Sequence, residues 1–199
     1  MLRISAVPAC EPLLAWIAEF KKQFPHIQVH CTMTDRVLDM TAGGIDVAFR
    51  MGALHGEQFI AKKVLSVRSK WVARPELLAQ YDRPQTVQDL ANFPLAGWVR
   101  NGETALSLKL GKQSYVLPYV FASNESGAIE FMALQGRTLC QLADYTADRL
   151  VAQHGLIEVL ADIAFPIVEE LKKYYGVGSP CRTICTVCGL PPCSTFSLL

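Results

Sequence analysis

Near the beginning of the chain stands the stretch LRISAVPACEPLLAWIAEFKKQFPHIQVHCTM, residues 2–33, in which the spacing of the apolar residues changes twice. Residues 2–6 alternate between apolar and polar side chains, which predicts a strand. Pro12 then suits the first turn of a helix, and Phe24-Pro25 ends it. Between them, apolar residues recur at helical spacing: Leu13, Ile17, Phe20 and Phe24. Residues 27–33 alternate again, so the stretch predicts a strand, a helix and a second strand.

The same order continues in the next residues. Thr34 or Asp35 is placed to cap a short helix, which the pair Gly43-Gly44 would end. Its apolar positions are Val37, Leu38 and Thr41. Residues 45–49 are apolar enough for a third strand. Strands that alternate with helices at these short spacings indicate an α/β fold with a parallel sheet and crossover helices.

A second unit is predicted further along the chain. Residues 64–73 suggest a long strand, Pro75 opens a helical turn, and Thr86 to Asp89 resemble a capping box. Gly111-Lys112 separates two short alternating runs, which predicts a hairpin of residues 106–110 and 113–117. The remaining expected elements are a strand at 119–122, a helix capped by Asn124 or Ser126 with Ile129, Met132 and Ala133 inward, a strand at 138–142, a helix at 146–153 and a strand at 156–160.

Two motifs of the first unit resemble the effector-binding domain of LysR-type transcriptional regulators. They are Thr34-Asp35-Arg36-Val37-Leu38-Asp39 and Gly44-Ile45-Asp46-Val47-Ala48-Phe49-Arg50-Met51-Gly52. The resemblance covers residues 2–175. It also includes Leu2 to Ala6, Phe20 to Ile27, Val72 to Leu78, Ser123-Asn124 and Gln141 to Tyr145.

The resemblance implies a two-subdomain fold of the periplasmic-binding-protein type II class, with two crossover strands and a small-molecule effector in the cleft between the subdomains. On this basis we expect subdomain I over residues 1–73, subdomain II over 74–165 and a return toward subdomain I over 166–177. A Cys- and Pro-rich tail follows at 178–199. The family pairs these domains antiparallel, so the resemblance also implies a homodimer, with the helix from Glu11 to Phe24 as the exposed apolar seam.

In open α/β sheets, ligands bind beyond the carboxyl ends of the strands, where helix starts offer backbone N–H groups to anions. We therefore expect a small, anionic metabolite there. The candidate effector-binding residues are Ala9, Cys10, Thr34, Arg50, Met51, Gly52, Trp98, Ser123 and Asn124. Six of them also have a structural alternative. Thr34, Ser123 and Asn124 can cap helices, Arg50 can pair with Asp35 or Asp46, Cys10 can be a buried small residue, and Trp98 can belong to the core.

Composition narrows the function. The 199 residues hold 19 Lys and Arg against 18 Asp and Glu, a net charge of +1, which does not favour direct nucleic acid binding by this chain. In the family a winged DNA-binding domain precedes this domain, and no such pattern precedes Leu2. We therefore expect the chain to bind an effector but not DNA. No apolar run reaches about 18 residues, so we expect a cytoplasmic protein outside the membrane. No nucleophile-base set or phosphate loop is present, so we expect no enzymatic activity and no cofactor.

The cysteines leave alternatives open. Cys181, Cys185 and Cys188 have the spacing of the radical S-adenosylmethionine iron-sulfur motif, and with Cys193 they offer an irregular zinc set. The four histidines show no metal-ligand spacing, so we predict no metal site. Residues 178–198 can also be reverse-translated so that a frame starting one base earlier resembles the family's usual ending, which predicts a frameshifted, poorly packed tail. A solute-binding protein of a transporter, which shares the fold, is the alternative function.

Overall fold

A computed structural model describes residues 1–8, 10–34, 44–51, 59–99, 102–163, 165 and 167–176. The chain divides into two compact units. Unit 1 consists of residues 1–66 with the chain from residue 169 onward, and unit 2 consists of residues 67–168. Two strands run through this division: β4 (Phe59–Ala73) and β11 (Ile167–Gly176). The division at 66/67 and 168/169 differs from the subdomain bounds expected from the sequence, 73/74 and 165/166, which remain a prediction.

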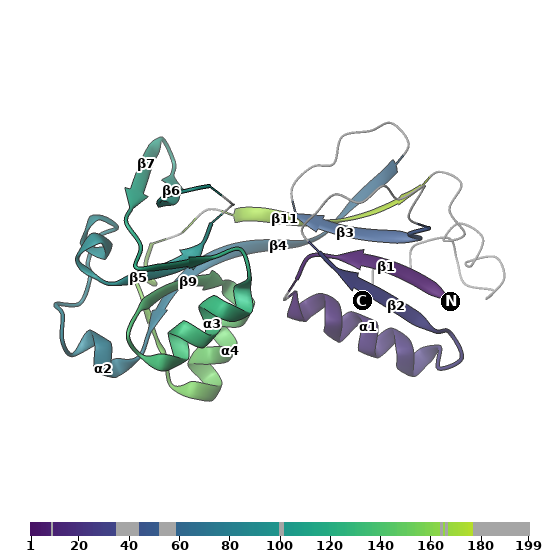
Figure 1. Ribbon diagram of the computed structural model, residues 1–199, viewed down its shortest axis with the longest axis horizontal. Coiled ribbons are helices and arrows are strands. Elements are labelled where there is room, and N and C mark those ends of the chain that lie inside the picture. The colour runs from purple at the N-terminus through teal and green to yellow at the C-terminus, as the bar shows by residue number, and fades with distance from the viewer. Residues whose placement is uncertain are drawn as a thin grey trace. The chain divides into compact units, whose positions relative to one another are not determined.

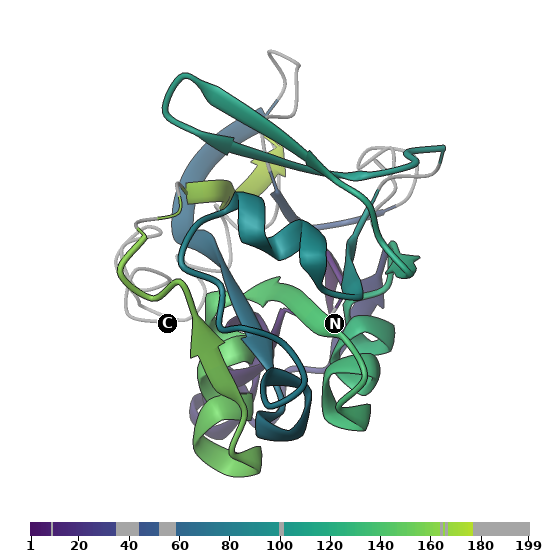
Figure 2. The ribbon, with the colours of Figure 1, turned by 90° about the vertical axis from the view of Figure 1, so that its left-hand side faces the viewer.

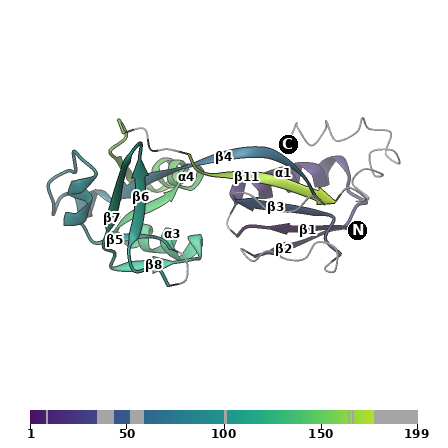
Figure 3. The same cartoon turned by 90° about the horizontal axis from the view of Figure 1, so that it is seen from above.

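The sheet of unit 1 has β1 (Leu2–Ala6) between β2 (Val29–Met33) and β3 (Val47–Met51), with both neighbours parallel to it. β11 lies antiparallel to β3. Viewed from above, β2, β1 and β3 lie side by side (Figure 3). The predicted strand-helix-strand over residues 2–33 is confirmed. The predicted short helix between Thr34 and Gly43 lies outside the described residues.

Helix α1 (Glu11–Gln23) lies along this sheet (Figure 1). Pro12 occupies its first turn, where a missing N–H costs nothing, and Lys21 and Lys22 lie in the last turn, near the negative end of the helix dipole. Leu13 and Phe20 are buried in one cluster with the sheet residues Ile4, Val47 and Phe49. Alternation along the strands fixes this face, because the same parity in β1 and β3 points toward α1.

The other parity of β1 and β3 carries polar side chains. Ser5 pairs with Ala48, and Arg50 lies two residues further along β3, on the same face. Ser5 and Arg50 are both buried, at 0% and 4% exposure. Unit 1 therefore has one apolar sheet face against α1 and one face on which buried polar groups must find hydrogen-bond partners.

In unit 2, β9 (Leu139–Ala143) lies between β4 and β5 (Leu95–Trp98), and β8 (Phe121–Ser123) extends the sheet. β5 is parallel to β8 and β9, whereas β4 is antiparallel to β9 and to β10 (Ile157–Val159). The other elements of this unit are α2 (Pro75–Leu78), the 3-10 helix η1 (Gln88–Asn92), β6 (Leu106–Leu110), β7 (Gln113–Leu117), α3 (Ser126–Gln135) and α4 (Asp144–His154).

Both faces of the unit 2 sheet are packed (Figure 2). The β6-β7 hairpin and η1 lie on one side, and α3 and α4 lie on the other. Trp71 and Leu139 belong to the cluster that includes the hairpin's Leu106, whereas Val72 and Cys140, one residue along each strand, belong to the cluster of α3 and α4. At Gly97 a Cβ atom would lie 2.6 Å from Leu106 Cδ2, so glycine is what allows the hairpin to approach β5.

The predicted hairpin is confirmed with its bounds, and the other predicted strands and helices of unit 2 form with shifted ends. The capping-box residues open a 3-10 helix, in which Asp89 accepts hydrogen bonds from the backbone N–H groups of Gln85 and Thr86 at 2.9 and 2.8 Å. Ile129 and Ala133 are buried as predicted for α3, and Met132 is partly buried against the same cluster. Among the described helices, none has the length and hydropathy that a membrane crossing requires. The Cys- and Pro-rich tail lies outside the described residues.

Candidate functional site

The carboxyl ends of the three parallel strands of unit 1 meet at one sheet edge. Ala6 pairs with Met33 on β2 and with Phe49 on β3, so Thr34 and Arg50 each follow a residue paired with Ala6. The Thr34 backbone N–H donates to the Ala6 carbonyl at 2.8 Å, which holds the end of β2 against β1. The predicted site residues Thr34 and Arg50 are therefore brought to the same edge of the sheet.

Cys10 immediately precedes α1 and is fully buried in the unit 1 cluster. Its carbonyl accepts hydrogen bonds from the Leu13 and Leu14 N–H groups, and its side chain makes no capping bond to the helix. Cys10 is thus a small, buried residue, and its contact with an effector stays a prediction. The neighbouring candidates Ala9 and Gly52 lie outside the described residues.

Arg50 and Met51 point to opposite faces of β3. The Arg50 guanidinium donates to the Phe49 carbonyl at 3.0 Å and to the Ser5 hydroxyl, on the face away from α1. Met51 packs against the apolar cluster that includes α1. Of the two predicted ion-pair partners, Asp35 lies outside the described residues, and Asp46 accepts the Arg3 backbone N–H at 2.8 Å. Arg50 thus donates hydrogen bonds within unit 1, and its side chain lies on the face of β3 opposite to that of Met51.

The three candidates of unit 2 come together at the ends of β5 and β8. The Trp98 indole Nε1–H donates to the Asn124 carbonyl at 3.0 Å, and the Val99 N–H donates to the Ser123 carbonyl at 3.2 Å. Trp98 remains 39% exposed, so it is not the core residue that the sequence allowed as an alternative. The indole is therefore held in place at one edge while part of its surface stays accessible.

The cap of α3 differs from the prediction. Asn124 and Ser126 were the expected capping residues, but Glu125 occupies the N-cap position, and its carboxylate accepts the Gly127 N–H at 2.9 Å. Ser123 supports the turn, because its hydroxyl accepts the Glu125 N–H at 3.0 Å. Glutamate is uncommon at an N-cap, where shorter polar side chains dominate, and this is why the sequence pattern missed it.

A second carboxylate that the sequence did not single out begins α4. Asp144 follows β9 directly, and its oxygens accept the Tyr145 N–H at 2.9 Å and the Arg68 N–H at 3.2 Å. The helix dipole makes a helix start attractive to anions, and in α3 and α4 an acidic side chain of the protein already takes that position. These two starts are therefore poor places for an anionic group of a ligand.

The described thiols are placed as structural groups. Burial raises the pKa of Cys140 to about 11, although the Thr138 hydroxyl beside it acts in the opposite direction. Burial also raises the pKa of Cys31. Both thiols are therefore protonated at neutral pH and are weak nucleophiles. Within the described ranges, no group of three or more His, Cys, Asp or Glu side chains is positioned to hold a metal ion. Cys181, Cys185, Cys188 and Cys193, whose spacing leaves a metal site as an alternative, lie outside these ranges.

Comparison with known proteins adds independent findings. Residues 1–169 match the family model described as the LysR substrate binding domain. HTH-type transcriptional regulator CrgA from Neisseria meningitidis serogroup C (strain 8013) is 27% identical over 166 residues, which cover 81% of this chain and 56% of that protein. An HTH-type transcriptional regulator from Xanthomonas campestris pv. campestris (strain 8004) is 28% identical over 174 residues, 82% of this chain and 51% of that protein. The chain thus spans about half the length of the curated relatives it matches.

Solved structures show the same fold. The regulatory domain of CrgA, a LysR-type transcriptional regulator from Neisseria meningitidis, matches with a TM-score of 0.75 at 24% identity over 88% of both chains. The regulatory domain of AphB from Vibrio vulnificus matches with a TM-score of 0.73 at 22% identity, over 88% of this chain and 90% of that one. The predicted periplasmic-binding-protein-like α/β fold is confirmed. Because the family model matches residues 1–169 of its 199 residues, this chain belongs to the LysR substrate-binding domain family.

Proposed function

We propose that the chain is the effector-sensing domain of a LysR-type transcriptional regulator and that it binds a small metabolite in the cleft between its subdomains. The observation that carries the proposal is the family match over residues 1–169. The clustering of polar candidates at the strand ends of each unit supports it, because α/β sheets bind ligands at that edge. In this proposal the domain binds a ligand and catalyses no reaction. The relatives support this, because they are named as transcriptional regulators.

DNA reading belongs, in this proposal, to a separate helix-turn-helix domain. The curated relatives are HTH-type regulators about twice as long as the matched region, and a net charge of +1 gives this chain little attraction for phosphates. The expected result is that the 199-residue protein alone shows no sequence-specific DNA binding at physiological salt. A regulator of this kind works beside the chromosome, so we propose the cytoplasm as its compartment.

We retain a small anionic metabolite as the proposed effector and place its charge at the unit 1 residues. The carboxylates of Glu125 and Asp144 already occupy the starts of α3 and α4 and would repel an anion there. The polar candidates of unit 1 are Thr34, at the end of β2, and Arg50, in β3. In unit 2, the accessible part of Trp98 and the side chains of Ser123 and Asn124 suit the uncharged part of the molecule.

Thermal-shift screening of small organic acids tests the proposal. A hit should bind at least about tenfold more weakly to the double variant Thr34→Val with Asn124→Ala, because each substitution removes a hydrogen-bonding group from a different unit. Ser114→Ala on the exposed side of the hairpin is the matched control and should leave affinity unchanged. Unchanged affinity in the double variant would show that the site has been assigned to the wrong residues.

We also propose that the chain forms a homodimer through α1. Leu14 is 46% exposed, and Ala18, one helical turn further on, is exposed as well. Together with Ala15 they form an apolar strip on the side of the helix away from the unit 1 cluster. Light scattering should give a dimer mass in the micromolar range, and Leu14→Glu should shift it toward the monomer. A monomer mass at all these concentrations would contradict the proposal.

A further inference from the structure

The indole of Trp71 carries a buried donor that meets no acceptor. Trp71 lies in β4 at 0% exposure, and its Nε1–H has no hydrogen-bond partner among the described residues. It is the one buried side-chain N or O atom of the described residues in this condition. A buried unsatisfied donor costs about 1–3 kcal/mol, and native proteins almost always supply it with an acceptor, either a protein group or an ordered water. The environment of this N–H therefore needs an explanation.

Strand register identifies the neighbours of this indole. Trp71 pairs with Val159 on β10 and with Gln141 on β9, and cross-strand partners point to the same face. Val159 offers no acceptor, so Gln141 is the neighbouring side chain that can. Ser69 stands two residues before Trp71 on β4 and shares its face. The polar groups of Ser69 and Gln141 make no side-chain hydrogen bond within the described part of the chain.

These three side chains differ in solvent exposure. Ser69 and Gln141 are partly exposed, whereas Trp71 belongs to the buried cluster under the β6-β7 hairpin. Ser69 pairs with Ala143 at the carboxyl end of β9, the sheet edge at which small molecules bind in α/β folds, and Trp71 pairs with Gln141 in the middle of that strand. A polar molecule small enough to sit beside Gln141 can accept from the Trp71 N–H and exchange hydrogen bonds with the amide. An ion would be costly there, because the surrounding cluster is apolar.

We propose that Ser69, Trp71 and Gln141 form a subsite for one neutral oxygen acceptor. Water is the acceptor in the free protein, and a hydroxyl or carbonyl oxygen of the effector replaces it on binding. The replacement rests on the proposed function, whereas the subsite itself does not. The subsite assigns to unit 2 a recognition group, the indole N–H of Trp71, that no sequence motif indicated.

The first arm of the test needs no effector. The full chain contains three tryptophans, so 15N-labelled indoles give three signals, and Trp71→Phe identifies the one from Trp71. That signal should show a nuclear Overhauser contact to water, which Gln141→Leu should abolish. The Trp98 indole donates to a protein carbonyl and is the internal reference. Gln153→Leu, on the exposed side of α4, is the matched control. A Trp71 signal without water contact would overturn the subsite.

A double-mutant cycle in urea provides a second readout. If one bound water joins both groups, Trp71→Phe and Gln141→Leu should each destabilise the protein, and their combined effect should fall short of additivity by about fivefold in the unfolding constant. Additive effects would overturn the subsite, since they would leave the two side chains independent.

The second arm uses an organic acid from the thermal-shift screen. Saturation with it should move the Trp71 indole signal and remove the water contact. A hit whose affinity depends on Thr34 and Asn124 but leaves the Trp71 signal in place would overturn the replacement while the proposed function stands. If no acid binds, the proposed function fails, and the water contact in the free protein still decides the subsite.

Discussion

The sheet of unit 2 packs against an apolar cluster on each face, whereas the sheet of unit 1 packs against an apolar cluster on one face and buries the polar pair Ser5 and Arg50 on the other. In β4 three consecutive residues, Trp71, Val72 and Ala73, are fully buried and pack alternately under the hairpin and under the helices. In β1 the consecutive residues Ile4, Ser5 and Ala6 are buried too, but the middle one is polar and accepts a hydrogen bond from Arg50. Unit 2 thus depends on packing on both sides of its sheet, and unit 1 depends partly on buried hydrogen bonds.

The largest effect should come from removing core volume in unit 2. Leu150 of α4 is fully buried, so Leu150→Ala should lower the free energy of unfolding by about 2–5 kcal/mol through lost transfer energy and a cavity. Urea denaturation measures this loss. Val151, the next residue along α4, is 36% exposed, and Val151→Ala should change stability by less than about 1 kcal/mol. Equal losses in the two variants would show that α4 does not pack as described.

Unit 1 should respond more sharply to a loss of hydrogen bonding. Ser5→Ala removes an acceptor from the buried Arg50 guanidinium, and hydrogen bonds to charged groups contribute about 1.5–3 kcal/mol. The expected loss in urea denaturation lies in that range. Thr32 pairs with Ser5 across β1 and β2 but is exposed, so Thr32→Ala is the matched control. A Ser5→Ala loss no larger than that of Thr32→Ala would remove the contrast between the two units.

The spacing of apolar residues predicted most of the fold, because in most elements the buried residues recur with the period of the helix or strand. Leu13 and Phe20 mark one face of α1, and the hairpin of residues 106–117 is set by an alternating pattern around Gly111, which has a positive φ of 58°. The pattern could not predict features that depend on contacts between residues far apart in the sequence. The burial of Arg50 follows from Ser5, 45 residues away, and the isolation of the Trp71 N–H follows from the pairing of β4 with β9.

The sequence predicted which candidate residues lie together better than it predicted their hydrogen bonds. Trp98, Ser123 and Asn124 do meet at the ends of β5 and β8. The sequence did not predict that Glu125 caps α3, because capping preferences are weak and the neighbouring Asn124 and Ser126 are better candidates by type. Its carboxylate changes the electrostatics of that helix start. Only the structure therefore shows whether a helix start is free to bind an anion or is already occupied by an acidic side chain.

A smaller, pH-dependent effect is expected on the helix-covered face of unit 2. Lys70 of β4 bonds to Asp148 of α4 at 2.6 Å and to Glu158 of β10 at 3.0 Å. Chiefly through its hydrogen bond with Asp148, the pKa of Lys70 is raised above 10.5. Lys70→Met should cost about 0.2–1 kcal/mol at neutral pH, since the Asp148 side chain is 60% exposed and solvent screens the pair.

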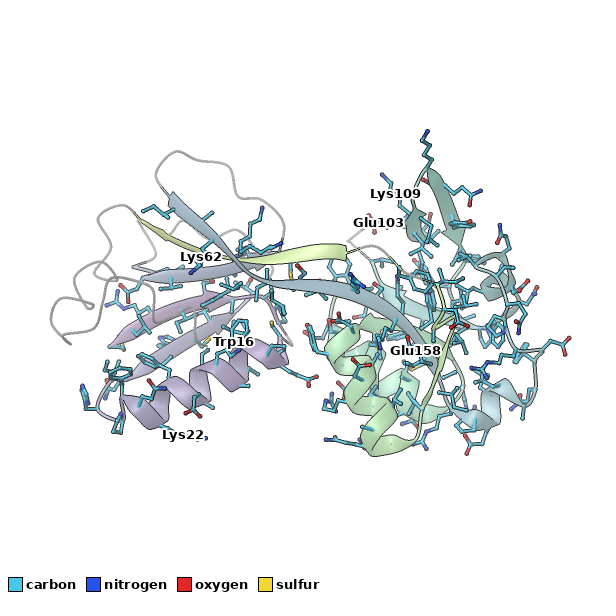
Figure 4. The ribbon with its side chains drawn as sticks, turned by 180° about the vertical axis from the view of Figure 1, so that it is seen from behind. Trp16, Lys22, Lys62, Glu103, Lys109 and Glu158 are labelled. Atoms are coloured by element: carbon cyan, nitrogen blue, oxygen red, sulfur yellow. The ribbon has the colours of Figure 1, made fainter. Side chains whose placement is uncertain are left out.

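The sign of the pH dependence follows from the direction of the shift. A raised lysine pKa stabilises the folded state fully below the unfolded value and loses that contribution as the pH rises through the folded value. The stability gap between the natural protein and Lys70→Met should therefore be constant from neutral pH to about 10 and narrow above 10.5. Lys109→Met, on the exposed hairpin away from Glu158 (Figure 4), is the control and should show no such narrowing. A gap that widens with pH would contradict the assigned pairing.

The smallest effect is expected at η1, where the carboxylate of Asp89 accepts backbone hydrogen bonds beside the buried Leu90. Asp89 accepts the backbone N–H groups of Gln85 and Thr86, and these bonds, the one from Gln85 first, lower the pKa of Asp89 below 3.8. A lowered carboxyl pKa stabilises the folded state above the unfolded value, and that contribution disappears as the pH falls through the folded value. Asp89→Asn keeps an oxygen acceptor but loses the charge, so the variant should be slightly less stable than the natural protein at neutral pH and equally stable at strongly acidic pH.

Carbon-13 titration of the Asp89 carboxyl measures its pKa shift directly. Asp82→Asn, in the exposed turn before η1, is the control for stability. A titration midpoint at or above 3.8 would mean that the two backbone bonds do not persist in solution, and that η1 is held by the burial of Leu90 and Phe93 alone.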